Sequence, residues 1–418
     1  MNSVKKKWID HLIFFILLLF LTKPAAFLSN LDPRINMLGI TLLLSVLIYF
    51  QIKVKDINVK SSVVISFVVI FLWIFYHYLV DSHFQYLAYC VFILNIYIGL
   101  LIVRYYNCSI VDYFDRVIYF LSIISLIGWT MSNLYGNGFL LGMPHFESAF
   151  GNTSGSFLIF TISGSNEGTF LNLYRNSGFA WEPGLFACMI VFAIMFRCMR
   201  IGKLFFFDKH IMIYIIALLT TMSTTGYIAL LVFIGLYFLF SSQIKIANKI
   251  LLCTLFLVSF IYLFSLPFMQ EKIIIQMQEE NYKTSQVYYQ NHNDYYCADR
   301  FEGISLDFLN IKDKPIMGYG IDRNDSYISR VISPYITISD GLLGPAASMG
   351  VLLATLLLVF FYYSIKKICL SYNFNHYWIV FLVFILCTIS YDYFNNPIMR
   401  ALCLFCIFFN KPIIKTYK

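Results

Sequence analysis

Apolar stretches of about 20 residues recur along the whole chain, and they constrain its fold more than any other feature. A helix of that length crosses the hydrocarbon core of a bilayer. With 60% hydrophobic and only 12% charged residues, against roughly 25% charged in soluble domains, this chain does not have the composition of a soluble globule. A transmembrane barrel would show shorter segments of alternating polarity. The sequence therefore predicts an all-α polytopic integral membrane protein.

We expect about twelve transmembrane helices, located with a window of about 19 residues. The basic residues Lys5 to Lys7 and the apolar run after them resemble a signal peptide, with Ala25-Ala26 as a weak cleavage site. An uncleaved first span is favoured because further spans follow it. Residues 1–418 would then form a single integral membrane domain. The expected spans lie near residues 9–28, 35–52, 61–80, 84–103, 117–135, 182–199, 210–223, 226–241, 248–268, 342–365, 376–393 and 397–412.

The distribution of basic residues predicts the orientation of the chain. The formal net charge is +8, and most of the 30 Lys and Arg residues fall in the segments that share a side with the N-terminus. Short cytoplasmic loops carry such an excess, whereas long loops are translocated regardless of charge. We therefore expect both termini in the cytoplasm, and we assign the positive charge to topology rather than to nucleic-acid binding.

This orientation leaves two long loops, residues 136–181 and 270–340, on the outer face. The first loop is rich in Gly, Ser and Asn but also carries phenylalanines, which suits a segment on the membrane surface; a flexible connector is the alternative. The second loop combines tyrosines with amide side chains, a mixture that suits sugars because rings stack on C–H faces and amides bond hydroxyls. Interfacial tyrosines are also ordinary in membrane proteins. So much chain on one side indicates that the function lies there.

Residues 175–184 are the strongest candidate for a functional site, because a polar loop there enters an apolar helix. Arg175 lies seven residues before Glu182, and the intervening Gly178 would let both side chains reach one cavity. A charged group at the membrane is costly unless it has a task. Glu182 precedes Pro183, so it could act as a base or sugar ligand, or could stabilise the helix start through the helix dipole.

Arginines of the outer loops are candidates for binding a pyrophosphate. Arg175, Arg300 and Arg323 remain charged at any relevant pH, and a guanidinium group pairs bidentately with phosphate oxygens. The alternative is that each is a surface arginine or forms a salt bridge with a nearby acid. A glycosyl transfer would also need a carboxylate to accept a hydroxyl proton. The candidates Asp81, Asp340 and Asp392 each lie at the outer end of a span, and spacing does not choose among them.

Several other chemistries lack a sequence signal. Only Cys297 falls in an outer loop, so no intramolecular disulfide is expected there. The histidines show no metal-ligand spacing, and no phosphate-binding G-x-x-x-x-G-K-[ST] motif is present. We expect no metal, no nucleotide and no other cofactor.

The run Arg175-Asn176-Ser177-Gly178-Phe179 to Glu182-Pro183-Gly184, after a fifth span and a loop, resembles the O-antigen polymerase family, the Wzy-type repeat-unit polymerases. That family belongs with the O-antigen ligases in one polytopic group of GT-C-like membrane glycosyltransferases, with about a dozen spans and two large periplasmic loops. The resemblance covers the topology and a few short motifs. The other matching pieces are Ser223-Thr224-Thr225-Gly226, Asp299-Arg300, Pro315-Ile316-Met317-Gly318-Tyr319-Gly320 and residues 340–350.

The resemblance implies transfer of a growing glycan from undecaprenyl pyrophosphate to an incoming lipid-linked repeat unit, at the periplasmic face of a bacterial inner membrane. Partners would be these lipid-linked oligosaccharides, the bilayer, and a chain-length regulator and flippase of the same pathway, with no nucleic acid. The expected site residues fall into a catalytic group, Arg175, Glu182, Arg300 and Asp340, and a substrate-binding group, Arg323, Tyr319, Gly178 and Gly184.

Two alternatives stay open at this point. Ligases of the group, which move glycan to lipid A core, would carry a histidine near the end of the large loop, where this chain has Ser339-Asp340; His292 keeps that reading open. A flippase or secondary transporter of lipid-linked sugars would keep charged or broken-helix sites near the bilayer midplane.

Overall fold

A computed structural model describes most of the chain and is mostly helical (79%). The described residues are 2–21, 45–53, 61–81, 84–147, 153–157, 159–164, 172–204, 207–240, 296–298, 300–334, 336–338, 343–389 and 397–409, with isolated positions at 246, 247, 249, 250, 254, 258, 261, 265 and 341.

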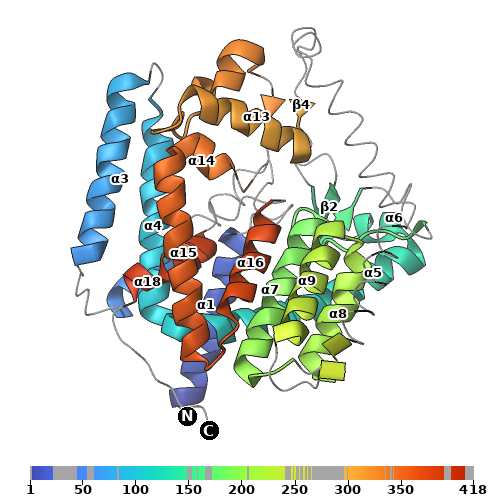
Figure 1. Ribbon diagram of the computed structural model, residues 1–418. Helices are drawn as coiled ribbons and strands as arrows, with labels where there is room; N and C mark the ends of the chain where they lie inside the picture. Colours follow the sequence, from blue (N-terminus) through green and yellow to red (C-terminus); the bar gives the residue numbers. More distant parts are fainter. Residues whose placement is uncertain are drawn as a thin grey trace.

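The helices of the described residues are labelled in chain order (Figure 1). They are α1 (Asn2–Leu21), α3 (Ser61–Val80), α4 (Tyr86–Tyr106), a 3-10 turn η1 (Asn107–Ser109), α5 (Ile110–Tyr135), α6 (Asn137–Leu141), α7 (Pro183–Ile201), α8 (Lys209–Thr221), α9 (Thr224–Phe240), α13 (Arg300–Asp313), a 3-10 turn η3 (Arg323–Asp325), a π-helical turn η4 (Ile328–Ile332), α14 (Gly344–Met349), α15 (Val351–Ser371), α16 (Tyr377–Thr388), α17 (Pro397–Cys403) and α18 (Phe405–Phe408).

Apolar helices indicate a membrane protein, as the sequence predicts. Within the described residues, 4 helical segments are long and apolar enough to cross a bilayer: Val63–Val80, Tyr86–Tyr135, Pro183–Ile201 and Val351–Ser371. Four shorter apolar helices lie at Trp8–Leu18, Lys209–Thr221, Thr224–Phe240 and Tyr377–Thr388. The finer expectation of about twelve spans stays a prediction, because much of the second and ninth expected spans lies outside the described residues.

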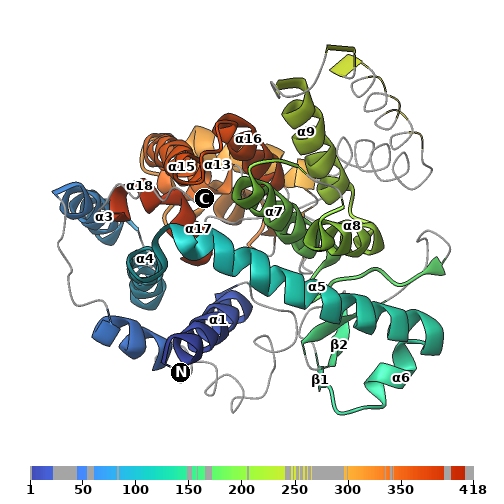
Figure 2. The same ribbon diagram turned by 90° about the horizontal axis from the view of Figure 1, so that it is seen from below.

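Three expected spans differ in detail from the structure. The fourth and fifth join through η1 into one helical segment, and α5 runs obliquely across the base of the bundle while α4 stands upright (Figures 1 and 2). The twelfth breaks into α17 and α18. Inside α17, the buried Arg400 donates to the Phe92 carbonyl oxygen of α4 at 3.2 Å and lies 4.4 Å above the Phe92 ring. Arg400 therefore anchors this short helix to α4. Averaging hydropathy over about 19 residues does not reveal such a single buried charge.

Helix α7 forms the centre of the bundle. Its residues are 83% buried, against 17% for the Val63–Val80 segment of α3, which stands at the edge (Figure 1). The rings of Phe192 on α7 and Phe384 on α16 stack with centroids 4.0 Å apart. On α3, apolar side chains such as Ile65 and Leu72 are exposed. An apolar helix can expose such a face where lipid covers it.

Two small sheets accompany the helices and refine the expected all-α class. Strands β1 (Phe146–Glu147), β2 (Thr153–Phe157) and β3 (Phe160–Ser163) form an antiparallel sheet within the predicted first loop. The ring of Phe160 covers Gly128 of α5, where no Cβ would fit. Strands β4 (Tyr296–Cys297) and β5 (Ile336–Thr337) pair in parallel within the second. The described parts of both predicted loops are therefore folded.

Candidate functional site

Residues 175–178, the arginine loop, lie between β3 and α7 against the end of α8. The Arg175 guanidinium donates through Nε to the carbonyl oxygen of Thr221 at 3.2 Å and through Nη2 to that of Met222 at 3.1 Å. Carbonyl groups at a helix C-terminus form the negative end of the helix dipole, so they attract a cation. These contacts hold the half-buried Arg175 at the end of α8.

Asn176 ties the arginine loop to two helices. Its backbone N–H donates to the Thr220 carbonyl oxygen at 3.0 Å, and its side-chain amide donates to the hydroxyls of Thr220 at 2.8 Å and Ser125 at 3.2 Å. Its side-chain oxygen accepts from the Gly178 N–H at 2.9 Å. Sequence reasoning did not select Asn176. The sequence did contain a signal, a polar amide in a segment that enters the membrane. A buried amide there needs hydrogen-bond partners from the protein.

Backbone geometry and packing explain the glycine at position 178. Gly178 has a φ of +56°, and a Cβ there would lie 2.7 Å from the ring of Phe186. Its carbonyl oxygen accepts from the Thr161 N–H of β3 at 2.7 Å. Gly184 is buried in the first turn of α7. Contacts of either glycine with a substrate remain a proposal.

Glu182 stands immediately before α7, at the N-cap position that the sequence predicts. Its backbone is extended, Pro183 follows as the first helical residue, and its side chain makes no capping hydrogen bond. Hydrogen-bonded capping therefore does not account for this half-buried acid, although the helix dipole still favours a negative charge here.

The stretch Ser223-Thr224-Thr225-Gly226 packs beside the arginine loop. A Cβ at Gly226 would lie 2.6 Å from the Cβ of Ala187, so α9 and α7 are in close contact near their N-terminal ends. Two separate pieces of the sequence that carry the family resemblance thus belong to one assembly. It contains four of the predicted site residues: Arg175, Gly178, Glu182 and Gly184.

A second assembly, the glycine junction, is formed by residues 315–320 against residues 344–350. The Tyr319 N–H donates to the Ala347 carbonyl oxygen at 3.0 Å, and the Gly320 N–H donates to that of Ser348 at 2.9 Å. Gly318 and Gly350 have φ values of +71° and +85°, and a Cβ at either would overlap the opposite backbone. This junction holds the predicted substrate-binding residue Tyr319, which is half-buried.

The glycine junction is seated on the ends of α3 and α4. The Met317 carbonyl oxygen accepts from Trp73 Nε1 at 2.9 Å and lies 3.1 Å from His77 Nε2. His77 Nδ1 lies 2.9 Å from Asp81 Oδ2, and these two side chains are 0% and 1% exposed. Among the acids left open by the sequence, Asp81 is thus a buried partner of a histidine rather than a solvated interfacial group.

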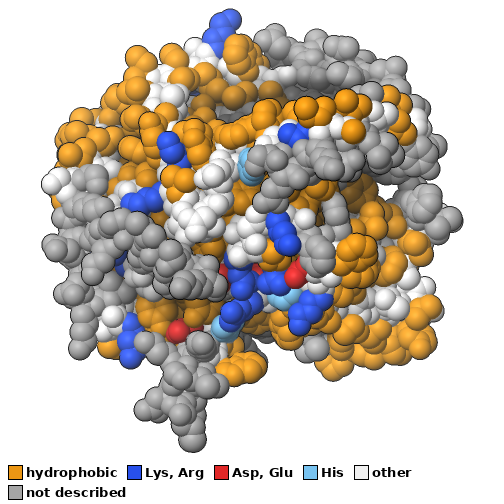
Figure 3. All heavy atoms as spheres, turned by 60° about the horizontal axis from the view of Figure 1, so that its bottom comes forward, with side chains coloured by type: hydrophobic (Ala, Val, Ile, Leu, Met, Phe, Trp, Pro, Cys, Tyr) orange, Lys and Arg blue, Asp and Glu red, His pale blue; other side chains and the backbone are white. Residues whose placement is uncertain are grey.

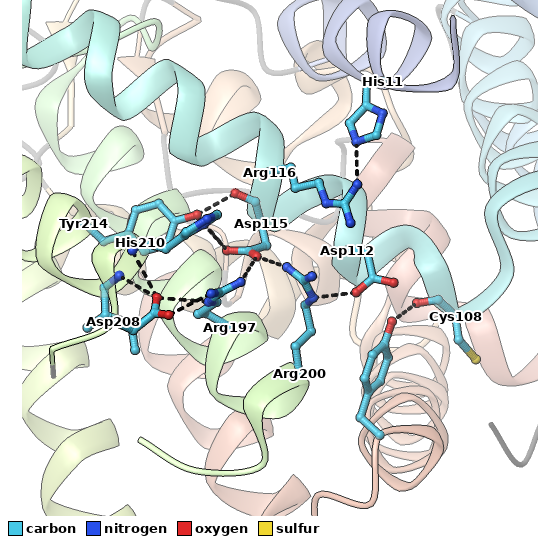
Figure 4. A network of polar contacts seen from close by, with 12 residues as sticks. His11, Cys108, Asp112, Asp115, Arg116, Arg197, Arg200, Asp208, His210 and Tyr214 are labelled. Atoms are coloured by element: carbon cyan, nitrogen blue, oxygen red, sulfur yellow. Dashed lines mark hydrogen bonds and ion pairs between the residues drawn. The ribbon is translucent and has the colours of Figure 1, made fainter. Parts of the chain in front are cut away.

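At the opposite end of α5, α7 and α8 lies a charged cluster that sequence reasoning missed (Figure 4). The fully buried Asp115 carboxylate accepts from Arg200, from Arg197 at 3.4 Å and from the Tyr214 hydroxyl at 2.8 Å. Its members are Asp112, Asp115, Arg197, Arg200, Asp208, His210 and Tyr214.

The remaining contacts of the charged cluster are ion pairs between arginines and carboxylates. Arg200 Nε lies 2.6 Å from Asp112 Oδ1. The Asp208 carboxylate accepts hydrogen bonds from Nε and Nη2 of Arg197 at 3.0 and 2.7 Å. Figure 3 shows Lys and Arg gathered on this face, with acids and histidines among them. The available signal was the spacing of three residues within Asp112/Asp115 and Arg197/Arg200, which puts each pair on one helix face.

Arginine binding lowers the pKa of Asp208. Burial acts to raise the pKa of this carboxyl. The hydrogen bonds and positive charge of Arg197 lower it, as do the N–H groups of Ile211 and His210. These groups outweigh burial, so the pKa of Asp208 lies below the usual 3.8. Because the carboxylates take up the guanidinium donors within the cluster, we assign it to holding three helices together.

The other predicted site residues are described only in part. Arg300 is the first residue of α13 and Arg323 opens η3, with only their backbones described. Asp340, Asp392 and His292 lie outside the described residues. In the part of the chain that the structure describes, no group of three or more His, Cys, Asp or Glu side chains could hold a metal ion.

Comparisons with known proteins do not assign this chain to a family. No protein-family model, no curated protein and no solved structure matches it. Inference about function therefore rests on the residues and their arrangement.

Proposed function

We propose that this chain is a membrane glycosyltransferase that polymerises lipid-linked repeat units, an O-antigen polymerase acting at the outer face of the bacterial inner membrane. The observation that supports this proposal is the pairing of four separated motif pieces. Arg175 bonds the carbonyl oxygens of Thr221 and Met222, directly before residues 223–226, and Gly226 of that stretch packs on Ala187 of α7. Residues 315–320 pair with residues 344–350. Both assemblies lie at helix ends away from the end where α1 begins (Figure 1).

The proposed chemistry needs charge binding, orientation and one base. The acceptor hydroxyl attacks the anomeric carbon of the donor, the bond from that carbon to the pyrophosphate oxygen breaks, and a carboxylate takes the hydroxyl proton. The lipid pyrophosphate departs with the bonding electron pair, and nearby cations stabilise its negative charge. Arg175, Arg300 and Arg323 are the proposed cations, and Glu182 or Asp340 is the proposed base.

The anchoring of Arg175 favours its role as a fixed cation. Its two hydrogen bonds to carbonyl oxygens orient the guanidinium at the end of α8, and a positioned donor stabilises developing charge without reorganising during the reaction. Glu182 follows at the start of α7, in the same assembly. Tyr319, Gly178 and Gly184 remain proposed substrate contacts.

One observation favours a transporter of lipid-linked sugars as a second candidate. Transporters often build their sites from broken helices with charged groups within the membrane. Here α17 and α18 are two short helices, and the buried Arg400 of α17 bonds the backbone of α4.

The test is surface polysaccharide from a strain that lacks this chain, complemented with wild type, Arg175→Ala or Arg330→Ala. Arg330 is the matched control, because it is also an outer-loop arginine but forms an exposed pair with Asp313. We expect a full ladder with wild type and Arg330→Ala, and core bearing one repeat with Arg175→Ala, since loss of such a donor costs about 10²–10³ in rate.

Three outcomes would contradict the proposal. A full ladder from Arg175→Ala at equal protein abundance would remove Arg175 from the site. Polymer that accumulates on its lipid carrier in the deletion strain would mean a ligase. Purified protein that moves lipid-linked repeats across vesicle membranes without joining them would mean a transporter.

A further inference from the structure

The histidine–carboxylate pair beneath the glycine junction has a proton requirement that follows from its geometry. A carbonyl oxygen only accepts hydrogen bonds, so His77 Nε2, which lies 3.1 Å from the Met317 oxygen, must carry a hydrogen. His77 Nδ1 lies 2.9 Å from Asp81 Oδ2, a distance that also requires a hydrogen between them. The arrangement therefore needs a proton at both places.

Two protons on the pair are one more than a neutral imidazole beside an ionised carboxylate holds. Either His77 is an imidazolium beside the Asp81 carboxylate, or neutral His77 accepts from a protonated Asp81. If this additional proton leaves, the remaining one is drawn to Nδ1, where it bonds the carboxylate. The Nε2 lone pair then faces the Met317 oxygen, and the hydrogen bond to the glycine junction is lost.

Every element packed around the pair contributes to its electrostatics. From α4, the Tyr89 ring stacks on the His77 ring with centroids 6.3 Å apart, and Gln85 bonds Asp322 at 2.8 Å. The charged groups of the second loop that act on Asp81 are Lys314, whose Nζ lies 4.0 Å from Asp81 Oδ1, and Asp325. Asp322 acts on the neighbouring Tyr89.

The surroundings of Asp81 favour its protonated form. Burial is the largest influence and raises the pKa of Asp81, and the negative charge of Asp325 raises it further. His77 and Lys314 act in the opposite direction, and the net pKa of Asp81 lies above the usual 3.8. Because both side chains of the pair are almost wholly buried, water cannot readily replace the lost bond.

Gly320 brings the glycine junction directly onto this pair. Its φ is +86°, and a Cβ there would lie 2.6 Å from the Tyr89 hydroxyl, 3.0 Å from His77 Nδ1 and 3.1 Å from Asp81 Oδ2. Tyr319 lies between Gly320 and the Gly318 turn. Any change in how the pair holds Met317 is thus transmitted within two residues to Tyr319.

We propose that His77 and Asp81 are positioning residues, which hold the glycine junction and Tyr319 in place through one additional proton. When rising pH removes that proton, the hydrogen bond to Met317 breaks and the junction is released. The sign follows from the count, since the closed junction binds one more proton than the released one. The link to polymer synthesis rests on the proposed function above. The proton-dependent contact between His77 and the glycine junction does not depend on that function.

Three variants separate this proposal from a merely structural role. Asp81→Asn replaces the carboxylate by an amide, which can donate to the Nδ1 atom of neutral His77 and leaves the hydrogen on Nε2. This variant keeps the junction closed at high pH. His77→Ala leaves the junction released at every pH. Trp73→Phe is the matched control, because it removes the other hydrogen bond to Met317 without removing a titrating group.

The measurement is hydrogen–deuterium exchange of the Tyr319 and Gly320 amides in the full chain in lipid nanodiscs, from about pH 5 to about pH 10, corrected for intrinsic exchange. We expect wild-type protection to fall about tenfold or more with rising pH, the effect of one charge-assisted hydrogen bond. Asp81→Asn should abolish that fall, and Trp73→Phe should lower protection at all pH values without changing the shape of the profile.

The proposal is overturned if wild-type protection is independent of pH, or if Asp81→Asn loses protection uniformly, as a structural role would require. Polymer synthesis measured over the same pH range tests the functional link separately. A pH-dependent hold in a protein that makes no polymer would refute the polymerase and leave the hold standing.

Discussion

The two ends of α5, α7 and α8 are built from different chemistry, although the same three helices supply both. At one end, Asp115 and its neighbours bury formal charges and bind them to one another. At the other end, the arginine loop is held by carbonyl oxygens, hydroxyls and a glycine packed against a ring. There Arg175 bonds the backbone carbonyl oxygens of Thr221 and Met222.

This difference shows which end is constrained by stability. A buried charge that loses its partner is far more costly than a neutral hydrogen bond that breaks. The charged cluster must therefore stay assembled for the helices to pack. In the arginine loop, the hydrogen bonds of Asn176 join neutral groups, so the loss of one of them costs less.

The comparison predicts its largest effect at Asp115. Asp115→Ala leaves Arg197 and Arg200 without their shared buried carboxylate, and we expect a loss of about 3–5 kcal/mol in the free energy of unfolding. Thermal unfolding of the purified protein in detergent measures it. The matched control is Asp313→Ala, which breaks an exposed pair with Arg330 and should cost about 0–1 kcal/mol. Equal losses would mean that the charged cluster is not the stabilising element.

A smaller effect is expected at the loop end from Asn176→Ala. The change removes the side-chain bonds to Ser125, Thr220 and Gly178, and unsatisfied buried groups of this kind cost about 1–3 kcal/mol. Asn324, which is exposed, supplies the control Asn324→Ala. A loss as large as that of Asp115→Ala would erase the distinction between the two ends.

The smallest effect concerns the acid dependence of the charged end. Since the folded-state pKa of Asp208 lies below its usual 3.8, its contribution to stability is present above that value and is lost as pH falls through the folded pKa. Unfolding midpoints recorded from about pH 6 to about pH 3 should therefore fall less steeply in Asp208→Asn than in wild type. Identical slopes would show that Arg197 does not stabilise the ionised carboxylate.

Sequence reasoning selected residues in both parts of the candidate site, but not the contacts that seat the second part. Arg175 and Glu182 are neighbours along the chain, so a local pattern was sufficient to select them. The seating of the glycine junction depends on contacts such as that of His77 with Met317, separated by 240 residues. The sequence did not select His77, because a single histidine in an apolar helix does not reveal its partner.

Composition and apolar run length alone determined the class of this protein, because the need to bury backbone polar groups in lipid acts on each segment independently. The local sequence also marked residues 175–184, whereas residues 315–320 and 340–350 were selected through the family resemblance. Only the tertiary structure decided that α7 is central and α3 peripheral, that Asp115 gathers two arginines, and that Met317 rests on His77. These features depend on which helix surfaces pack together. Neither segment of a distant pair shows in its own sequence that it will be buried or charge-paired by the other.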